Sequence, residues 1–136
     1  MSEGQGQVRQ LRVVVEAEDF EQAAQFYRDE LGLEVELDLE SEGGAHVLIL
    51  HAGRATLELS NPAQVALIDD VEVGRRVSPH IRLAFEVVDA DATTKRLAQA
   101  GADVIAEPTR TPWDSVNARL AAPAGLQLTL FEELSD

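Results

Sequence analysis

Four polar residues stand at corresponding places in two halves of this sequence. Arg12 and Arg82 are 70 residues apart, and Glu58 and Thr129 are 71 apart. Two guanidinium groups can bind a carboxylate or phosphate bidentately, and a threonine hydroxyl can add a hydrogen bond. A glutamate between them can orient the arginines or accept a proton as a general base. If the four side chains converge, they form a site for a small anionic ligand.

Each of the four residues lies in a segment that reads as a β-strand. In these segments apolar residues alternate with polar ones, and successive side chains of a strand point to opposite faces of its sheet. The apolar set should pack against a helix, so we expect all four polar side chains on the other face. The four strands are predicted at Leu11–Val15, Arg54–Ser60, Ile81–Val87 and Gln127–Phe131.

The first and third of these strands are each followed by a predicted helix. Asp19 and Asp89 are the expected N-caps, and Gly32 and Gly101 follow the last helical residues. The remaining strands are predicted at Leu33–Leu39, Ala45–His51, Val104–Ala106 and Asn117–Ala121. Together these segments form two βαβββ units that repeat at about 70 residues, which indicates an internal duplication.

The predicted fold is α+β: two tandem βαβββ repeats that form a cup-shaped, partly open eight-stranded mixed sheet with helices outside. The first module spans residues 8–60, a polar linker spans 61–79, and the second module spans 80–133, all in one domain, 8–133. Val65–Ile68 in the linker predicts a helical turn, and Ala52–Gly53 predicts a hairpin turn that places Val47 opposite Glu58. The sequence leaves open whether the modules pair within one chain or across a dimer.

The net charge of the chain restricts the classes of partner that it can bind. Eleven basic and 25 acidic residues give a formal charge of −14, which disfavours nucleic acid and anionic membrane surfaces. The chain has no cysteine, so disulfides and thiolate ligands are excluded. Its first residues, Met1–Gln7, are polar and glycine-rich, without an apolar signal segment. We therefore expect a cytoplasmic protein with no membrane partner.

An ordered set of short motifs resembles the vicinal oxygen chelate superfamily, which includes glyoxalases, bleomycin resistance proteins, methylmalonyl-CoA epimerases and extradiol dioxygenases. The resemblance implies a cup that holds a small molecule, in a protein that forms a homodimer. The motifs are Asp19–Tyr27, Leu31–Leu33, Ala55–Leu59, Phe85–Asp89, Pro112–Trp113, Pro123–Gly125 and Leu128–Glu132.

The resemblance also implies four metal-ligand positions, normally His or Gln, Glu, His and Glu, and these fall on Arg12, Glu58, Arg82 and Thr129. Only the glutamate is an ordinary ligand, since a guanidinium stays protonated and has no lone pair to give. We therefore expect no metal and no other cofactor. His80, two residues before Arg82, is the one substitute ligand to weigh, whereas the other two histidines are expected away from the centre.

Three interpretations follow. The first is a metal-free small-molecule binding protein, whose anionic or mixed-charge ligand is held by Arg12, Arg82, Thr129, Glu58 and His80, with Trp113 as an apolar wall. The second is a glyoxalase-like lyase, isomerase or epimerase that uses Glu58 as base, or an unusual metal site recruiting His80. The third is a cup plugged by a closed Arg12–Glu58–Arg82 salt-bridge cluster. The sequence favours the first and does not decide whether the protein is an enzyme.

Overall fold

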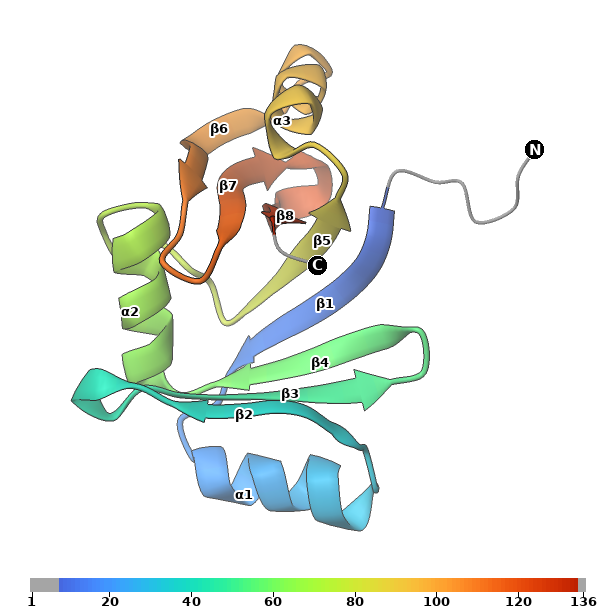
Figure 1. Ribbon diagram of the computed structural model, residues 1–136, viewed down its shortest axis with the longest axis vertical. Coiled ribbons are helices and arrows are strands. Elements are labelled where there is room, and N and C mark those ends of the chain that lie inside the picture. The colour runs from blue at the N-terminus through green and yellow to red at the C-terminus, as the bar shows by residue number, and fades with distance from the viewer. Residues whose placement is uncertain (1–7, 135–136) are drawn as a thin grey trace.

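Eight strands and three α-helices make up residues 8–134, the part of the chain that the computed structural model describes (Figure 1). The strands are β1 (Val8–Glu16), β2 (Val35–Glu40), β3 (His46–Ala52), β4 (Ala55–Ser60), β5 (Ile81–Val87), β6 (Asp103–Arg110), β7 (Ser115–Ala122) and β8 (Leu126–Glu133). The helices are α1 (Phe20–Ala24), continued by the π-helical segment η1 (Gln25–Glu30), then α2 (Pro62–Glu72) and α3 (Ala90–Gln99). All helices within residues 8–134 are too short or too polar to span a bilayer.

The eight strands form one mixed sheet in the order β2-β3-β4-β1-β5-β8-β7-β6. β1 and β5 lie antiparallel in its middle, while β4 and β8 pair in parallel with β1 and β5, respectively. The two βαβββ units therefore join through their first strands within a single chain. Within the described residues β2 and β6 are edge strands, so the curled sheet of Figure 1 stays open rather than closing into a barrel. These features confirm the predicted fold class.

Two apolar clusters hold α1 and α3 against the outer, convex face of the sheet. The first contains Phe20, Ala24, Leu48, Leu50 and Leu59. The second contains Val87, Ala90, Ala118, Leu120 and Leu130. Because side chains alternate along each strand, this packing turns the polar sets of β1, β4, β5 and β8 toward the inner face.

Both outer helices begin and end where the sequence predicts. The side chains of Asp19 and Asp89 accept hydrogen bonds from backbone N–H groups in the first turns of α1 and α3. Gly32 and Gly101 follow the helical segments with φ of 86° and 116°. A left-handed residue at this place is readily provided by glycine, which has no Cβ to clash.

The segment between the units departs from its prediction. The sequence indicated a polar linker with one helical turn at Val65–Ile68, whereas the structure forms an 11-residue helix, α2. The side chain of Asn61 caps its start. Unlike α1 and α3, α2 lies on the inner side of the sheet (Figure 1). There its Asp69 and Glu72 accept hydrogen bonds from the inward-facing Arg119 of β7.

The hairpin between β3 and β4 also turns one residue later than predicted. The turn is Gly53–Arg54 rather than Ala52–Gly53, and the glycine has φ of 69°. Glu58 therefore pairs with Ile49, and the predicted pairing with Val47 is wrong. Moving the turn by one residue shifts the register by two, so every side chain keeps its predicted face.

Candidate functional site

The inner face of the sheet borders a cavity of about 450 Å³. Both modules contribute to it, and α2 adds side chains from its inward side. A volume of this size falls in the range of small-molecule sites, ~300–1,000 Å³. Five of the six candidate site residues line the cavity: Arg12, Glu58, Arg82, Trp113 and Thr129.

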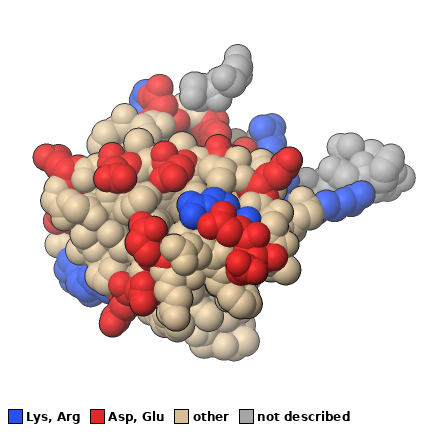
Figure 2. Space-filling model, turned by 90° about the horizontal axis from the view of Figure 1, so that it is seen from below, with Lys and Arg blue, Asp and Glu red and all other residues tan. Residues whose placement is uncertain are grey.

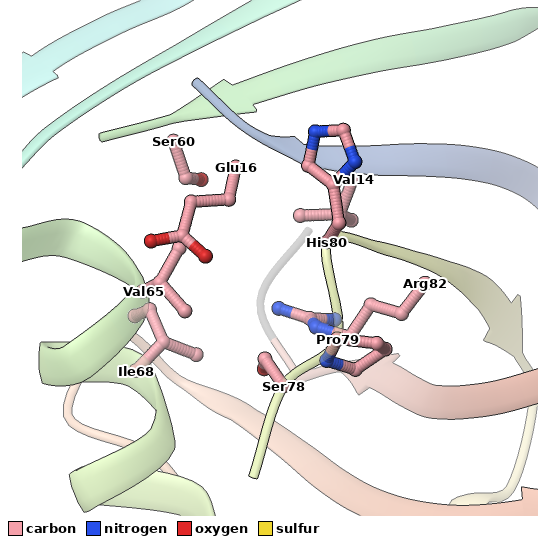
Figure 3. A pocket seen from close by; sticks show the side chains of 9 residues that line it. All are labelled: Val14, Glu16, Ser60, Val65, Ile68, Ser78, Pro79, His80 and Arg82. Atoms are coloured by element: carbon pink, nitrogen blue, oxygen red, sulfur yellow. The ribbon is translucent and has the colours of Figure 1, made fainter. Parts of the chain in front are cut away.

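The sixth candidate, His80, borders a different and much smaller pocket (Figure 3). His80 immediately precedes β5 and is exposed to solvent. The pocket has a volume of about 10 Å³, enough for roughly one water molecule. Arg82 borders both spaces, whereas Glu58 borders only the larger one. The structure thus does not bring His80 and Glu58 together in one cavity.

Arg82 is a buried cation whose direct partner is neutral. The residue is 8% exposed, and its Nη1 donates a hydrogen bond of 2.6 Å to Oγ1 of Thr129. Among residues 8–134, no carboxylate forms an ion pair with it. Burial lowers the pKa of the Arg82 guanidinium and the charge of Arg119 lowers it further, while the more distant charges of Glu72, Glu58 and Asp69 offset only part of this lowering. The protein therefore holds this positive charge at an energetic disadvantage.

Arg12, at the equivalent position of the first module, is compensated. Its Nη2 lies 3.2 Å from Oε2 of Glu36, and its Nη1 lies 3.9 Å from Oε1 of Glu58. The guanidinium carbon also lies 5.3 Å from the ring centre of Phe131, a cation–π distance. Two carboxylates and an aromatic ring thus share one guanidinium.

Glu58 faces the cavity and is partly shielded, with 15% of its side chain exposed. Oγ of Ser60 donates a hydrogen bond of 3.3 Å to its Oε2. Because Glu58 contacts Arg12 loosely and makes no ion pair with Arg82 in the described structure, the closed Arg12–Glu58–Arg82 cluster is not formed. The centre of the cup is a cavity and not a salt-bridge plug.

Trp113 lies at the edge of the cavity in the loop between β6 and β7, with 47% of its surface exposed. The hydroxyl oxygens of Thr111 and Ser115 are 2.7 Å apart and connect the two ends of this loop. Asp114 has φ of 64°, a left-handed conformation that few non-glycine residues adopt. The loop is thus held in a tight turn that places the indole beside the cavity.

A buried polar cluster beside the cavity contains residues that the sequence analysis did not single out. Arg119, fully buried, donates from Nε to Glu72 and from Nη1 to Asp69, both at 2.9 Å. Nδ2 of Asn117 donates a bond of 2.6 Å to Glu72. The cluster anchors α2 to β7, and Glu72 and Asn117 also line the cavity. Strand alternation could have placed Asn117 and Arg119 inside, since Ala118 and Leu120 pack outward.

Asp69 is the most strongly perturbed carboxyl in this cluster. Burial by itself would raise its pKa, but hydrogen bonds from Ser78, Val77 and Arg119 outweigh burial and lower the pKa to about 2. Nη1 of Arg76 lies 3.3 Å from Oδ2 of Asp69 and provides a second positive charge beside that of Arg119. Asp69 is therefore a permanently charged anchor of α2 at neutral pH.

Two polar atoms at the cavity wall are buried without a hydrogen-bond partner in the described structure. They are Oε1 of Gln64, on α2, and Nε of Arg12. Buried polar groups are usually paired, and an unpaired one costs ~1–3 kcal/mol. Both lie in residues that border the cavity, where a ligand could supply the missing partner.

The side chains at the four central positions do not fit a divalent metal ion. They offer one carboxylate and one hydroxyl, together with two guanidiniums that carry positive charge and no free lone pair. Across residues 8–134, no three His, Cys, Asp or Glu side chains are grouped so that they could hold a metal.

Comparisons with known proteins agree with this architecture. The family model for the glyoxalase/bleomycin resistance protein/dioxygenase superfamily matches residues 9–130. Solved structures with the same fold include a hypothetical protein from Bacillus halodurans C-125, at 16% identity and a TM-score of 0.65, covering 95% of both chains. They also include methylmalonyl-CoA epimerase from Mycobacterium tuberculosis, at 23% identity and a TM-score of 0.63, covering 94% of this chain and 88% of the epimerase.

A superfamily member from Vibrio splendidus 12B01 aligns at 13% identity and a TM-score of 0.61, over 90% of this chain and 97% of that one. No curated protein sequence matches significantly. The structural likenesses, all at low identity, establish the fold, and the family match spans most of the sequence. The chain belongs to the glyoxalase/bleomycin resistance protein/dioxygenase superfamily.

Proposed function

We propose that this protein binds a small molecule in the cup between its two modules, and that an anionic group of the ligand pairs with Arg82 without the help of a metal. The observation that carries the proposal is the state of Arg82: buried, hydrogen-bonded to a neutral hydroxyl, and adjoining a cavity. A buried charge without a counterion is unfavourable, so a carboxylate or phosphate entering the cavity would gain a charge-assisted hydrogen bond.

The donor set at the centre of the cup supports a metal-free site. Guanidiniums at positions 12 and 82 would repel a divalent cation and attract an anion. Arg12 is already engaged by two carboxylates, so we assign the main contact to Arg82 and a secondary role to Arg12. Thr129, which accepts a hydrogen bond from Arg82, holds the guanidinium in place.

The test is calorimetric titration with benzoate, octanoate and inorganic phosphate as probes. At least one should bind saturably, and Arg82→Gln should weaken that binding roughly 10- to 100-fold, the value of a hydrogen bond to a charged group. Arg12→Gln is the matched variant at the equivalent position and should weaken binding by a smaller factor. Failure of all three probes to bind, or equal affinity in Arg82→Gln, would contradict the proposal.

A second candidate function is isomerisation or lysis, with Glu58 as the base. Its support is the position of the Glu58 carboxylate, which borders the cavity. Glu58 and Arg82 lie on either side of Val14 of β1, and Glu58 has the position in its module that Thr129 has in the second. Proteins named methylmalonyl-CoA epimerase share the fold, which makes epimerisation the first activity to assay. The form of this hypothesis that recruits a metal through His80 has less support, because His80 borders a separate pocket.

Glu58→Gln separates this candidate from simple binding. If Glu58 acts as the base, the variant should lose turnover while it retains the fold and the affinity for carboxylate probes. An active Glu58→Gln variant would eliminate Glu58 as the base.

A further inference from the structure

On one side of the cavity the first module provides a continuous apolar wall, while Leu67, Ile68, Ala84, Trp113 and Phe131 add apolar surface elsewhere in the lining. On β2 and β3, Leu37 pairs with Ile49 and Leu39 with Val47, and all four line the cavity. Val47 and Ile49 are buried, whereas Leu37 and Leu39 are 40% and 49% exposed. The wall therefore runs from the buried sheet out to the edge strand and ends in two leucines that are open to solvent.

The second module borders the cavity from the other side with a mixed lining, in which polar side chains stand beside Ala84, Trp113 and Phe131. Arg82, Asn117 and Thr129 reach the cavity from β5, β7 and β8, which lie on the far side of β1 from β2 and β3. A ligand that spans the cavity would therefore meet Arg82 at one end and aliphatic side chains at the other.

The charges around the cavity limit how much negative charge a ligand can bring. Its lining contains two basic residues and five acidic ones, Glu36, Glu58, Glu72, Asp114 and Glu133. The protein as a whole carries a formal charge of −14, and acidic side chains spread over the face on the α1 side (Figure 2). One anionic group can pair with Arg82, but each further negative charge meets carboxylates and a repulsive field.

We infer that the cup takes an amphiphilic monocarboxylate, with its carboxylate at Arg82 and an aliphatic or aromatic body on the wall formed by Leu37, Leu39, Val47 and Ile49. The inference rests on the proposed anion contact and narrows it to one ligand class. Polyanions such as dicarboxylates, nucleotides and coenzyme A thioesters are disfavoured by the acidic lining. Phosphate monoesters, which carry more than one negative charge near neutral pH, fall in the same disfavoured group.

A homologous series of acids tests the apolar wall. In calorimetric titrations of the full chain, affinity should rise from butanoate through hexanoate to octanoate, by up to roughly fourfold for each methylene group that becomes buried. Octanedioate has the same chain length as octanoate with a second carboxylate, and it should bind at least about tenfold more weakly, since its far end would lie against aliphatic side chains and acidic groups. Acetyl-CoA should show no saturable binding.

Leu39→Ser probes the wall with little risk to folding, because the side chain is half exposed. The variant should lose several-fold affinity for octanoate and almost none for butanoate. Val35→Ser is the matched control: Val35 lies on the same strand, is 45% exposed and does not line the cavity. It should leave both affinities unchanged.

The outcomes separate this inference from the proposal beneath it. If neither the carboxylates, benzoate included, nor inorganic phosphate binds, both are wrong; if phosphate alone binds through Arg82, the anion site stands and the amphiphilic ligand class is wrong. If carboxylates bind through Arg82 but affinity does not change with chain length, or Leu39→Ser has no effect on octanoate, the anion site stands and the amphiphilic ligand class is wrong. Tighter binding of octanedioate or acetyl-CoA than of octanoate would likewise overturn the ligand class alone.

Discussion

Arg12 and Arg82 occupy equivalent positions in the two modules, yet their surroundings differ. In each module the arginine reaches toward the same position of the fourth strand, which is Glu58 in the first module and Thr129 in the second. A carboxylate there, joined by Glu36, compensates Arg12, whereas a hydroxyl leaves Arg82 with its charge unmatched. The duplicated backbone thus supplies two similar places, and the carboxylates of Glu36 and Glu58 engage one arginine while the other remains available to a ligand.

A second comparison lies within the second module. Arg119 and Arg82 are both buried, but Arg119 has two carboxylates at 2.9 Å, from Asp69 and Glu72. Within the described residues, the carboxylates of α2 form ion pairs with Arg119 and none with Arg82. Cations at neighbouring inward positions therefore serve different purposes: Arg119 fixes a helix, and Arg82 is left facing the cavity.

The largest effect is expected from removing one of the two carboxylates that pair with Arg119, which makes its surroundings more like those of Arg82. Asp69→Asn breaks a fully buried ion pair and leaves Arg119 with Glu72 as its one remaining carboxylate partner in the described residues; removing one partner of a buried pair typically costs ~3–5 kcal/mol. Urea unfolding should show this loss in the free energy of unfolding. Asp70→Asn, at the next and exposed residue of α2, should change it by less than about 0.5 kcal/mol. Similar values for the two variants would mean that the Asp69–Arg119 pair does not anchor the helix.

The second largest effect tests whether the residue at position 129, on the fourth strand of the second module, determines if Arg82 is available to a ligand. Thr129→Glu gives the second module the arrangement of the first, so the new carboxylate should pair with Arg82 and displace the ligand. Octanoate affinity should fall roughly 10- to 100-fold. Thr129→Val is the control, because it removes the hydroxyl without adding charge and should cost less than Thr129→Glu. A Thr129→Glu variant that is folded by circular dichroism and binds octanoate like the unmodified protein would break the comparison.

The pH dependence of stability provides a third test, through Asp69. Its pKa is about 2 in the folded protein against 3.8 ordinarily, so its contribution is fully present above about pH 4 and is lost as pH falls toward 2. The difference in pKa corresponds to roughly 2 kcal/mol. The gap in unfolding free energy between the unmodified protein and Asp69→Asn should therefore shrink by about this amount between pH 5 and pH 2. A gap that stays constant would show that Asp69 titrates normally.

The elements that form the cup could be predicted because each obeys a local rule. Alternating apolar residues give β5 its bounds and direct Arg82 inward, and aspartate caps with following glycines delimit α1 and α3. The 70-residue offset between the modules then predicts which side chains face inward in one module from those that face inward in the other. These rules need no tertiary information, and they brought Arg12, Glu58, Thr129 and Arg82 to one cavity.

The sequence did not reveal α2 at full length, because this helix buries polar residues. Gln64, Asp69 and Glu72 are all buried, and the two carboxylates pair with Arg119 and Asn117, so no apolar stripe marks the helix. A helix of this kind is recognisable only once its polar partners on β7 are known. The same lack of tertiary information concealed the difference between the arginines, which depends on Glu36 of an edge strand whose pairing register contains a bulge.

The smallest expected effect is also the most direct comparison of the two arginines, made without any ligand. Arg82→Met replaces a buried, unmatched charge by an apolar side chain and should raise the free energy of unfolding by about 1 kcal/mol, since the gain is partly offset by the lost bond to Thr129. Arg12→Met removes the partner of Glu36 and Glu58, which remain partly solvated, and should lower it by up to about 1 kcal/mol. Opposite signs in urea unfolding are the signature of one compensated and one uncompensated arginine. If both variants lower the free energy of unfolding by the same amount, the surroundings of Arg82 stabilise its charge to the same extent as those of Arg12. The role of Arg82 would then be structural.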